Sequence, residues 1–254
     1  MPDSPLVPLN GAAAACADCS YRENLLAAGR CQPGDICVRA HSGRQIDRFL
    51  RRNPQLAADY IADPFWERRA IAARYAPLDS VRPLAGDPDE VVRRAVATRL
   101  PAAELHRMMR DPDREVRVTV ASRLAPLELG TLLTDPDYMV RLQVAHRLPH
   151  GQLPRMAFDP DPEVRKEVAR RLPAFALKKM ALDPEAEVRR IAAGRMLPDD
   201  AAAMLADSDW MVRRAAALRA SLASLITLLD DPDEEVRDAA RRRIAGLGEN
   251  EETS

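Results

Sequence analysis

The chain has 254 residues, of which 46% are hydrophobic, 30% are charged and only 4% are aromatic, and its formal net charge at pH 7 is −1. Any core must therefore be built from aliphatic side chains rather than rings. The near-zero net charge argues against general binding to nucleic acid or to an anionic membrane, because both need a net basic surface.

The first residues and the hydropathy predict a protein of the cytoplasm. The N-terminus, Met-Pro-Asp-Ser-Pro-Leu-Val, lacks the basic start and apolar core of a secretory signal. No apolar run approaches the ~18 residues that would span a bilayer. In the cytoplasm, cysteines normally stay reduced or bind metal.

Four cysteines close to the N-terminus predict a metal site. They follow a C-x2-C-x11-C-x5-C pattern, and the first pair is spaced so that one short turn can aim both thiolates at one centre. The segment also has too little apolar mass to fold without such a staple. Reduced thiols without a common role, and disulfides, are the alternatives. The predicted ligands are Cys16, Cys19, Cys31 and Cys37.

The cysteine spacing alone does not identify the metal. Four thiolates serve tetrahedral zinc as well as a [4Fe–4S] cluster, and the spacing matches neither the double C-x2-C zinc ribbon nor the compact ferredoxin run. His41, four residues after Cys37, could replace one thiolate in a Cys₃His site. Gly11, Gly29 and the Pro33-Gly34 step permit tight turns around an ion or a cluster.

From Asp63 onward, an aspartate recurs every 24 residues, which predicts stacked units too small to bury their apolar faces alone. Counted from that aspartate, position 2 is usually proline, position 3 is usually acidic and position 7 is always arginine. Residues 39–62 are a degenerate unit that we expect to cap the array, with Gln45 in place of the arginine, while Pro54 and Leu56 are kept. The eight aspartates are Asp63, Asp87, Asp111, Asp135, Asp159, Asp183, Asp207 and Asp231.

Each unit predicts an α-helix of about three turns and a shorter helical return. The position-1 aspartate would be the N-cap, with proline in the first turn and the position-3 acid near the positive end of the helix dipole. Apolar positions 6, 10 and 14 form one helical stripe, and a proline then ends the helix. Apolar positions 19 and 22 favour one or two turns of α or 3₁₀ helix. No strand pattern occurs, so the expected fold is an all-α solenoid.

The arginine at position 7 lies on the apolar side of the helical wheel, where an unpaired charge would be costly. We expect it to pair with an aspartate at position 1 or 3 of its own or an adjacent unit, giving a ladder of ion pairs that sets the stacking register. The members of this row are Arg69, Arg93, Arg117, Arg141, Arg165, Arg189, Arg213 and Arg237.

A second arginine row stands at position 13, at the edge of the apolar arc, where stems can pack while heads reach solvent. These side chains could line a groove for an acidic partner, or they could be engaged in further pairing within the chain. The candidate partner-binding residues are Arg99, Arg123, Arg147, Arg171, Arg195, Arg219 and Arg243.

Cysteines at the N-terminus followed by 24-residue units with Asp-Pro-Asp, Val-Arg and Arg-Leu-Pro resemble the leucine-rich repeat variant (LRV) family, in the form that carries an iron–sulfur domain. The resemblance covers essentially the whole chain, with Ser208 and Arg68 as local departures. It implies alternating α and 3₁₀ helices in a right-handed superhelix, and a [4Fe–4S] cluster on the four cysteines, with zinc as the alternative. It implies no established reaction, although the family looks like one found among nitrogen-fixing bacteria.

The expected domains are a cysteine-rich iron–sulfur domain with its capping unit at 1–60, an eight-unit solenoid at 61–246 and a disordered polar tail at 247–254. The leading hypothesis is a redox or sensing iron–sulfur module attached to a scaffold that binds an unknown protein partner. The alternatives are a nucleic-acid-binding solenoid similar to HEAT arrays, with a purely structural metal, and a cluster without any electron-transfer role.

Enzymatic activity is not expected, because the chain contains no glycine-rich phosphate loop and no HExxH or GxSxG motif. His146 and His150 are four residues apart, but Pro149 breaks the helix between them, so they do not predict a metal pair.

Overall fold

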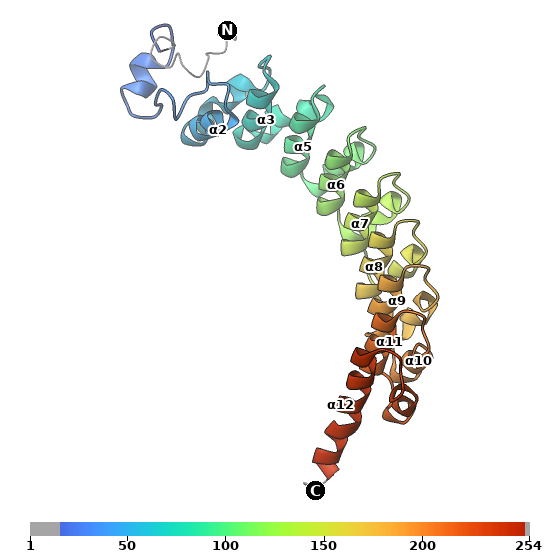
Figure 1. The fold of residues 1–254 in the computed structure, drawn as a ribbon. Coiled ribbons are helices and arrows are strands. Elements are labelled where there is room, and N and C mark those ends of the chain that lie inside the picture. Colours follow the sequence, from blue (N-terminus) through green and yellow to red (C-terminus); the bar gives the residue numbers. More distant parts are fainter. Residues whose placement is uncertain (1–15, 252–254) are drawn as a thin grey trace. The chain divides into compact units, whose positions relative to one another are not determined.

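The computed structural model describes residues 16–251, with side chains described for 16–246. The chain divides into two compact units, Met1–Ala125 and Pro126–Ser254. Figure 1 shows the helices in chain order. Of the expected disordered tail at 247–254, residues 247–251 continue helix α12, and residues 252–254 lie outside the described residues.

Within residues 16–251 the fold is all-α, and the expected fold class is confirmed. That range contains no β-strand, only one isolated bridge between Gln32 and Ile36. No helix among the described residues is long and apolar enough to cross a membrane.

The elements of the first unit are η1, a π-helical turn (Arg22–Leu26), α2 (Gly43–Arg52), η2 (Pro54–Tyr60), α3 (Trp66–Tyr75), α4 (Leu78–Val81), η3 (Arg82–Gly86), α5 (Glu90–Arg99), η4 (Ala102–Met108) and α6 (Arg114–Arg123). Those of the second unit are η5 (Pro126–Leu132), α7 (Tyr138–Arg147), η6 (Leu153–Met156), α8 (Pro162–Arg171), η7 (Ala174–Met180), α9 (Ala186–Ala193), α10 (Pro198–Ala202), α11 (Trp210–Ala217), η8 (Leu222–Leu228) and α12 (Glu234–Glu251).

Most repeats are a 10-residue α-helix followed by a short 3₁₀ helix, so the predicted 3₁₀ return is confirmed. The helix ends where the position-14 residue turns extended ahead of proline, as Leu100 does with φ −60° and ψ 144°. Two layers vary the return: α4 precedes η3 in one, and α10 replaces the 3₁₀ helix in the other.

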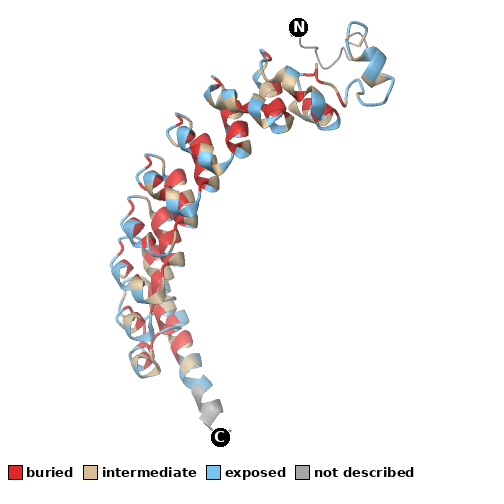
Figure 2. Cartoon of the chain, turned by 180° about the vertical axis from the view of Figure 1, so that it is seen from behind, coloured by how far each residue is buried: buried red, intermediate tan, exposed pale blue. Residues whose placement is uncertain are grey.

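The core of each unit lies between the row of α-helices and the row of short helices. Val92, Val96 and Leu100 form the stripe of one layer and are fully buried, and Leu105 and Met108 close it from the return. Figure 2 shows buried residues along the inner sides of the helices and exposed ones in the turns. The core is therefore aliphatic, as the composition requires.

The N-cap assignment from sequence was wrong: the cap is the acid at position 3, not the aspartate at position 1. Asp89 has the extended backbone of an N-cap, and its carboxylate accepts a hydrogen bond from the N–H of Val91 at 3.0 Å. Asp87 instead accepts the N–H of Asp89 at 2.9 Å, which closes a turn of the chain ahead of the helix. Since this turn comes before the helix, the position-1 carboxylate remains free to contact the preceding layer.

The arginine ladder is confirmed, and six of its arginines are seen to join two layers. The Nε and Nη2 of Arg93 donate to the two carboxylate oxygens of Asp111 in the next unit, at 2.8 and 2.9 Å. Its Nη1 donates to the carbonyls of Asp87 and Pro88 in its own unit, at 2.8 and 3.1 Å. The same arginine–aspartate bridge is made by the pairs Arg69–Asp87, Arg141–Asp159, Arg165–Asp183, Arg189–Asp207 and Arg213–Asp231.

The first repeat compensates for the arginine that its capping unit lacks. Because Gln45 stands at position 7 of residues 39–62, Asp63 receives no arginine from the preceding layer. Arg68, at the position that later units give to valine, lies 3.2 Å from the Asp63 carboxylate, and both side chains are buried. Its guanidinium carbon also lies 5.6 Å from the ring centroid of Phe65. The two departures from the repeat therefore form one local substitute for the ladder.

Removing a ladder arginine should cost much more than removing the arginine at the end of the ladder. Arg165→Ala leaves the buried Asp183 carboxylate unpaired, and we expect a loss of about 3 kcal/mol in the free energy of unfolding. Arg237 makes the same carbonyl bonds, but no ion pair holds it among the described residues, so Arg237→Ala should cost only about 1 kcal/mol. Urea unfolding followed by circular dichroism measures both; equal losses would contradict a ladder that holds the layers together.

The ladder should also make the fold sensitive to acid. Hydrogen bonds from Arg213 lower the pKa of Asp231 below its ordinary value of 3.8 and outweigh the opposite effect of burial. A lowered pKa in the folded state gives stability that is complete above the unfolded value and is lost as the pH falls through the folded value. We expect unfolding to begin below about pH 4.

Asp231→Asn should be less stable at neutral pH and should lose less stability on acidification, as measured by thermal unfolding across that range. The exposed neighbour Asp230 is the control, since Asp230→Asn leaves the pair intact. An unchanged acid slope in Asp231→Asn would show that this pair does not carry the acid sensitivity.

Candidate metal centre and the arginine rows

The described part of the cysteine segment is a series of tight turns. The N–H of Cys19 bonds the carbonyl of Cys16 at 3.4 Å, so the C-x2-C pair lies on one turn, as its spacing predicts. The left-handed turns expected at two glycines are present, with φ of 66° at Gly29 and 78° at Gly34, whereas Gly11 lies outside the described residues. These turns bring Cys31 and Cys37 back towards the first pair.

The four thiols are free, partly exposed and close enough to influence one another electrostatically. Burial raises the pKa of Cys31, and the charges of Cys19, Cys37 and Cys16 raise it further. Within the described range, no three Cys, His, Asp or Glu side chains lie close enough to share one metal ion. The donor set itself, four uncommitted thiols on one short segment, fits a thiolate-bound metal or cluster.

Cys37 has the most developed surroundings of the four. Burial raises the pKa of its thiol, and the backbone N–H groups of Arg39 and Ala40 oppose that effect by hydrogen bonding to the sulfur. Its own N–H donates to the carbonyl of Gln45 on α2, at 3.3 Å. Backbone N–H groups directed at a cysteine sulfur stabilise the thiolate, the form that binds metal.

The segment is anchored to the capping unit by hydrogen bonds. The amide of Asn53, fully buried at the end of α2, donates to the carbonyls of Arg30 and Phe49 at 3.1 and 2.9 Å. Arg30 donates to the carbonyl of Arg52 at 2.8 Å, and Gln45 donates to that of Gly34 at 2.8 Å. The capping unit therefore holds the loops that carry Cys31 and Cys37.

A pair of tyrosines completes the contact between the segment and the capping unit. The hydroxyls of Tyr21 and Tyr60 are 2.9 Å apart, and the Tyr21 ring lies 5.4 Å from that of Phe49. Burial raises the pKa of Tyr60, and the hydrogen bond with Tyr21 adds to this effect. Cys19 lies near enough to influence both hydroxyls electrostatically. The two half-buried tyrosine hydroxyls therefore lie beside the thiols.

The alternative ligand His41 has a contact of its own. Its exposed ring lies 6.0 Å from the ring centroid of Phe65, in the first repeat. His146, considered and set aside from the sequence, pairs through Nδ1 with the buried Glu167 at 2.9 Å.

The position-13 arginines are engaged within the chain. The Nη1 and Nη2 of Arg99 donate to the carbonyls of Ala73 and Ala76, at 2.8 and 3.1 Å, where helix α3 ends. Each such arginine thereby satisfies carbonyls that the preceding helix leaves without partners. Whether the row also binds an acidic partner stays a prediction. The arginines with this contact are Arg99, Arg123, Arg171, Arg195, Arg219 and Arg243; Arg147 is also engaged.

Sequence reasoning missed the buried Asn53 and the tyrosine pair. A signal for Asn53 existed, because an asparagine directly ahead of a helix-ending proline is a strong cap and turn residue. The tyrosines lie 39 residues apart, and no local pattern links them.

Asn53→Ala should loosen the cysteine segment. The change removes two hydrogen bonds from a fully buried side chain, and we expect a loss of about 1–3 kcal/mol with faster amide hydrogen exchange in residues 16–37. Gln55 is the matched control, because it is exposed and accepts from Arg30 only at 3.4 Å. Equal exchange in Asn53→Ala and Gln55→Ala would show that Asn53 is not the anchor.

Comparison with known proteins agrees with this arrangement. Residues 9–59 match the family described as LRV protein FeS4 cluster, and residues 138–161 and 162–185 match the leucine rich repeat variant family. The chain is therefore an iron–sulfur repeat protein.

Two individual proteins are similar. A solved structure, described as a leucine-rich repeat variant with a novel repetitive protein structural motif, is 56% identical with a TM-score of 0.86, over 89% of this chain and 97% of that one. An uncharacterized 27.7 kDa protein in the nifB 3'region of Rhodobacter capsulatus is 41% identical over 105 residues, 41% of this chain and only 42% of that protein. The chain belongs to the leucine-rich repeat variant family, in the form with an N-terminal iron–sulfur cluster domain.

Proposed function

We propose that the four cysteines hold a [4Fe–4S] cluster that carries or senses electrons, and that the repeats bind a protein partner. The observation that supports this most is that one segment, anchored to the capping unit, carries four free thiols near enough to influence one another electrostatically. On this proposal, residues 1–60 form the iron–sulfur domain with its cap and 61–246 form the binding scaffold. The free thiols also favour the cytoplasm as its location.

The residues around the thiols suit a cluster. Such a cluster supplies one-electron transfer, and its potential depends on hydrogen bonds to sulfur and on exposure to solvent. The N–H groups of Arg39 and Ala40 bond the Cys37 sulfur, and the half-buried Tyr60 hydroxyl lies near Cys19. Gly29 and Gly34 provide turns that a residue with a Cβ would adopt only with strain.

A sensing role follows from the way the segment is anchored. The loops of Cys31 and Cys37 bond the capping unit through Asn53, Gln45 and Arg30, so a change in the cluster would act on contacts at the start of the repeats. A cluster that only stabilised the cysteine loops would not require these bonds between the loops and the capping unit. This contact therefore supports coupling between the cluster and the repeats.

A protein partner is favoured over nucleic acid. The position-13 arginines, which could have met phosphates, donate to helix carbonyls, and the position-7 arginines are bound to aspartates. With a net charge of −1, the chain as a whole has no excess of positive charge for a phosphate backbone. The exposed surface instead offers apolar side chains beside charged ones, as protein interfaces do.

Chemical analysis tests the cluster. Purified without oxygen, the chain should be brown, with equal iron and sulfide, and its visible absorption should bleach with dithionite and recover on reoxidation without unfolding. Each Cys→Ser change at the four positions should lower the iron content, because a cluster ligand is lost. His41→Ala, the control, should keep it, since His41 instead contacts Phe65.

Four outcomes would contradict the proposal. Zinc without sulfide would replace the cluster with a structural ion. Iron lost in His41→Ala but kept in one Cys→Ser variant would give a Cys₃His site. Iron kept in all of the cysteine variants would show that these cysteines are not the ligands. A cluster that cannot be reduced without unfolding the chain would have a structural role only.

A further inference from the structure

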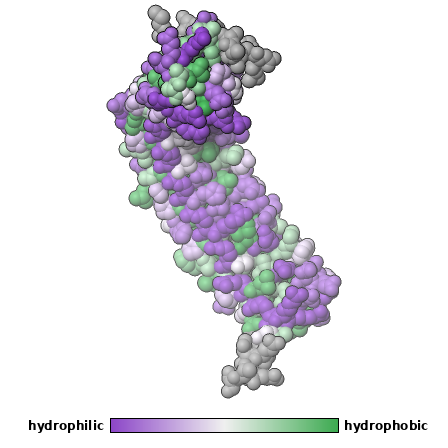
Figure 3. Space-filling view, turned by 90° about the vertical axis from the view of Figure 1, so that its left-hand side faces the viewer, coloured by the Kyte–Doolittle hydropathy of each residue, from purple (hydrophilic) through white to green (hydrophobic). Residues whose placement is uncertain are grey.

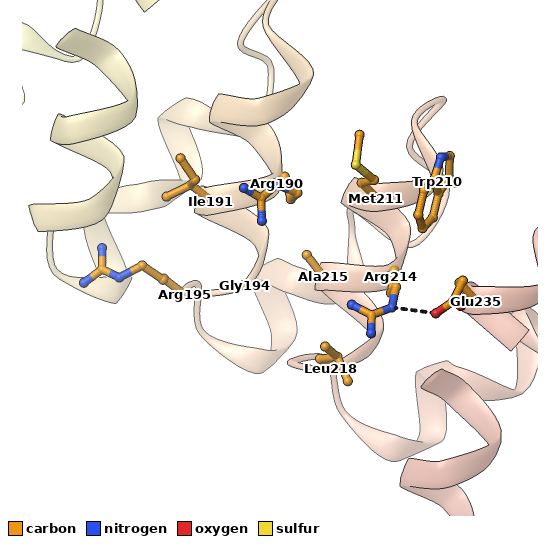
Figure 4. A pocket seen from close by; sticks show the side chains of 10 residues that line it. All are labelled: Arg190, Ile191, Gly194, Arg195, Trp210, Met211, Arg214, Ala215, Leu218 and Glu235. Atoms are coloured by element: carbon orange, nitrogen blue, oxygen red, sulfur yellow. Dashed lines mark ion pairs between the residues drawn. The ribbon is translucent and has the colours of Figure 1, made fainter. Parts of the chain in front are cut away.

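The second unit has a hollow on the outer face of its helices. It lies among α9, α11 and the start of α12 and has a volume of about 500 Å³ (Figure 4). Gly194 and Ala215 line its middle, and the large apolar side chains around it include Trp210, Met211 and Leu218. These three are 39–51% exposed, which is unusual for their types.

The sequence opens this hollow by changing one face of the repeat. In α8 this outer face carries Glu163, Lys166 and Arg170, all in ion pairs. At the same positions, the repeat of α9 has Gly194 in place of Arg170, and the repeat of α11 has Met211 and Leu218 in place of Glu163 and Arg170. A Cβ built at Gly194 would lie 3.6 Å from the nearest atom, the Arg190 carbonyl oxygen, so the missing side chain creates space and relieves no clash.

The charge around the hollow is positive. Its lining carries three arginines, Arg190, Arg195 and Arg214, but only one carboxylate, that of Glu235. Arg195 donates to the Ala169 carbonyl at 2.5 Å, and Figure 4 shows it directed away from the other lining residues. The two guanidinium groups that remain beside the apolar side chains belong to Arg190 and Arg214.

Both of these arginines can exchange their present partners. Arg190 lies 3.2 Å from Glu187, which also binds Lys166, and Arg214 lies 3.5 Å from Glu235. All of these carboxylates and both arginine side chains are at least 43% exposed. Exposed ion pairs of this kind are weak, so a carboxylate that binds both arginines at once can replace them.

We propose that this hollow binds an acidic segment of a protein partner, with an apolar side chain of that segment seated between Trp210 and Leu218 and its carboxylates on Arg190 and Arg214. Tryptophan and arginine dominate binding energy at protein interfaces, and methionine adapts to varied apolar groups. The proposal names the binding site and partner chemistry for the scaffold role assigned above and rests on that role.

Other parts of the surface suit such a segment less well. A second hollow of about 550 Å³ lies beside Phe158 and Leu182. Its lining has no excess of positive charge, because Arg165 and Lys179 are balanced by Asp159 and Asp183, and its arginine is held in the buried pair with Asp183. Figure 3 shows hydrophobic residues as separate patches among hydrophilic ones on one face. Of these two hollows in the described part of the chain, the one at Gly194 combines exposed apolar groups with exchangeable arginines.

Synthetic peptides added to the full, cluster-loaded chain test the proposal. The probes are short fluorescein-labelled peptides in which leucine or phenylalanine stands among aspartates at helical and at alternating spacings. Matched peptides carry lysine for aspartate, or alanine for the apolar residue. Trp66→Phe leaves Trp210 as the reporter of binding, because the chain has two tryptophans. We expect the acidic apolar peptides to change its fluorescence and both matched sets to bind at least tenfold more weakly.

Variants locate the site. Arg190→Glu with Arg214→Glu should weaken binding by at least about tenfold, and Gly194→Trp, which fills the hollow, should do the same. Ser122→Trp is the control, because Ser122 is exposed and holds the same position of its own repeat on α6. It should bind as the parent does. Binding by the tryptophan variants is read from the anisotropy of the fluorescein-labelled peptide, because the added tryptophan would mask Trp210, and circular dichroism and iron content should be unchanged in all variants.

Several binding results would overturn the inference. It fails if no acidic apolar peptide changes the fluorescence of Trp210, if lysine peptides or duplex DNA bind as well, or if Gly194→Trp and Ser122→Trp behave alike. If the peptides bind all variants as tightly as the parent, the binding site is not at Gly194, but the scaffold role is not contradicted. A chain that lacks a reducible cluster yet binds peptides at Gly194 would contradict the redox proposal alone.

Discussion

The arginine at position 7 is the interaction on which the repeat structure depends. One guanidinium group binds two carbonyls of its own turn and both carboxylate oxygens of the next aspartate, so that it uses its fork-shaped set of donors across two layers. The aspartate can accept them because its turn precedes the helix, which a different acid caps. Shifting one layer against the next would break both bonds to the carboxylate. Apolar contacts between valines and leucines tolerate such shifts, whereas the ladder does not.

This constraint explains where the chain departs from its own repeat. A ladder needs a first aspartate without a preceding arginine, and Arg68 fills that need from within the first repeat while Gln45 bonds the cysteine loop. The capping unit therefore has two faces with different tasks, one packed on the first repeat and one holding the metal segment. In the second unit, Arg237 keeps its carbonyl bonds with no ion pair among the described residues.

Periodicity made most of the fold predictable. The buried stripe, the 3₁₀ return and the arginine–aspartate pairing all follow from residues that recur in every unit, because a recurring residue must satisfy the same contact each time. The N-cap was misassigned because Asp-Pro-Asp offers two capping residues, and only the extended backbone of Asp89 decides between them. The tyrosine pair occurs once and no local pattern links its members, whereas the Asn53-Pro54 step indicated a cap or turn but not the contact of Asn53 with the cysteine segment. Thiol spacing predicted the donor set, but the surroundings of Cys37 depend on tertiary contacts.

In a repeat protein, function is best sought where a position breaks its own rule without a structural need. Arg68 breaks the valine rule, and the pairing with Asp63 accounts for it fully. Position 12 carries a polar residue in six of the eight units, and Gly194 breaks that rule although it has ordinary helical φ and ψ and a Cβ there would cause no clash. Leu218 stands at the same position in the next repeat and is half exposed. Folding alone gains nothing from an exposed leucine beside an empty space, since a polar residue would serve equally well there. A binding surface does gain, because such a space supplies both the contact area and the shape that hold a partner's side chain.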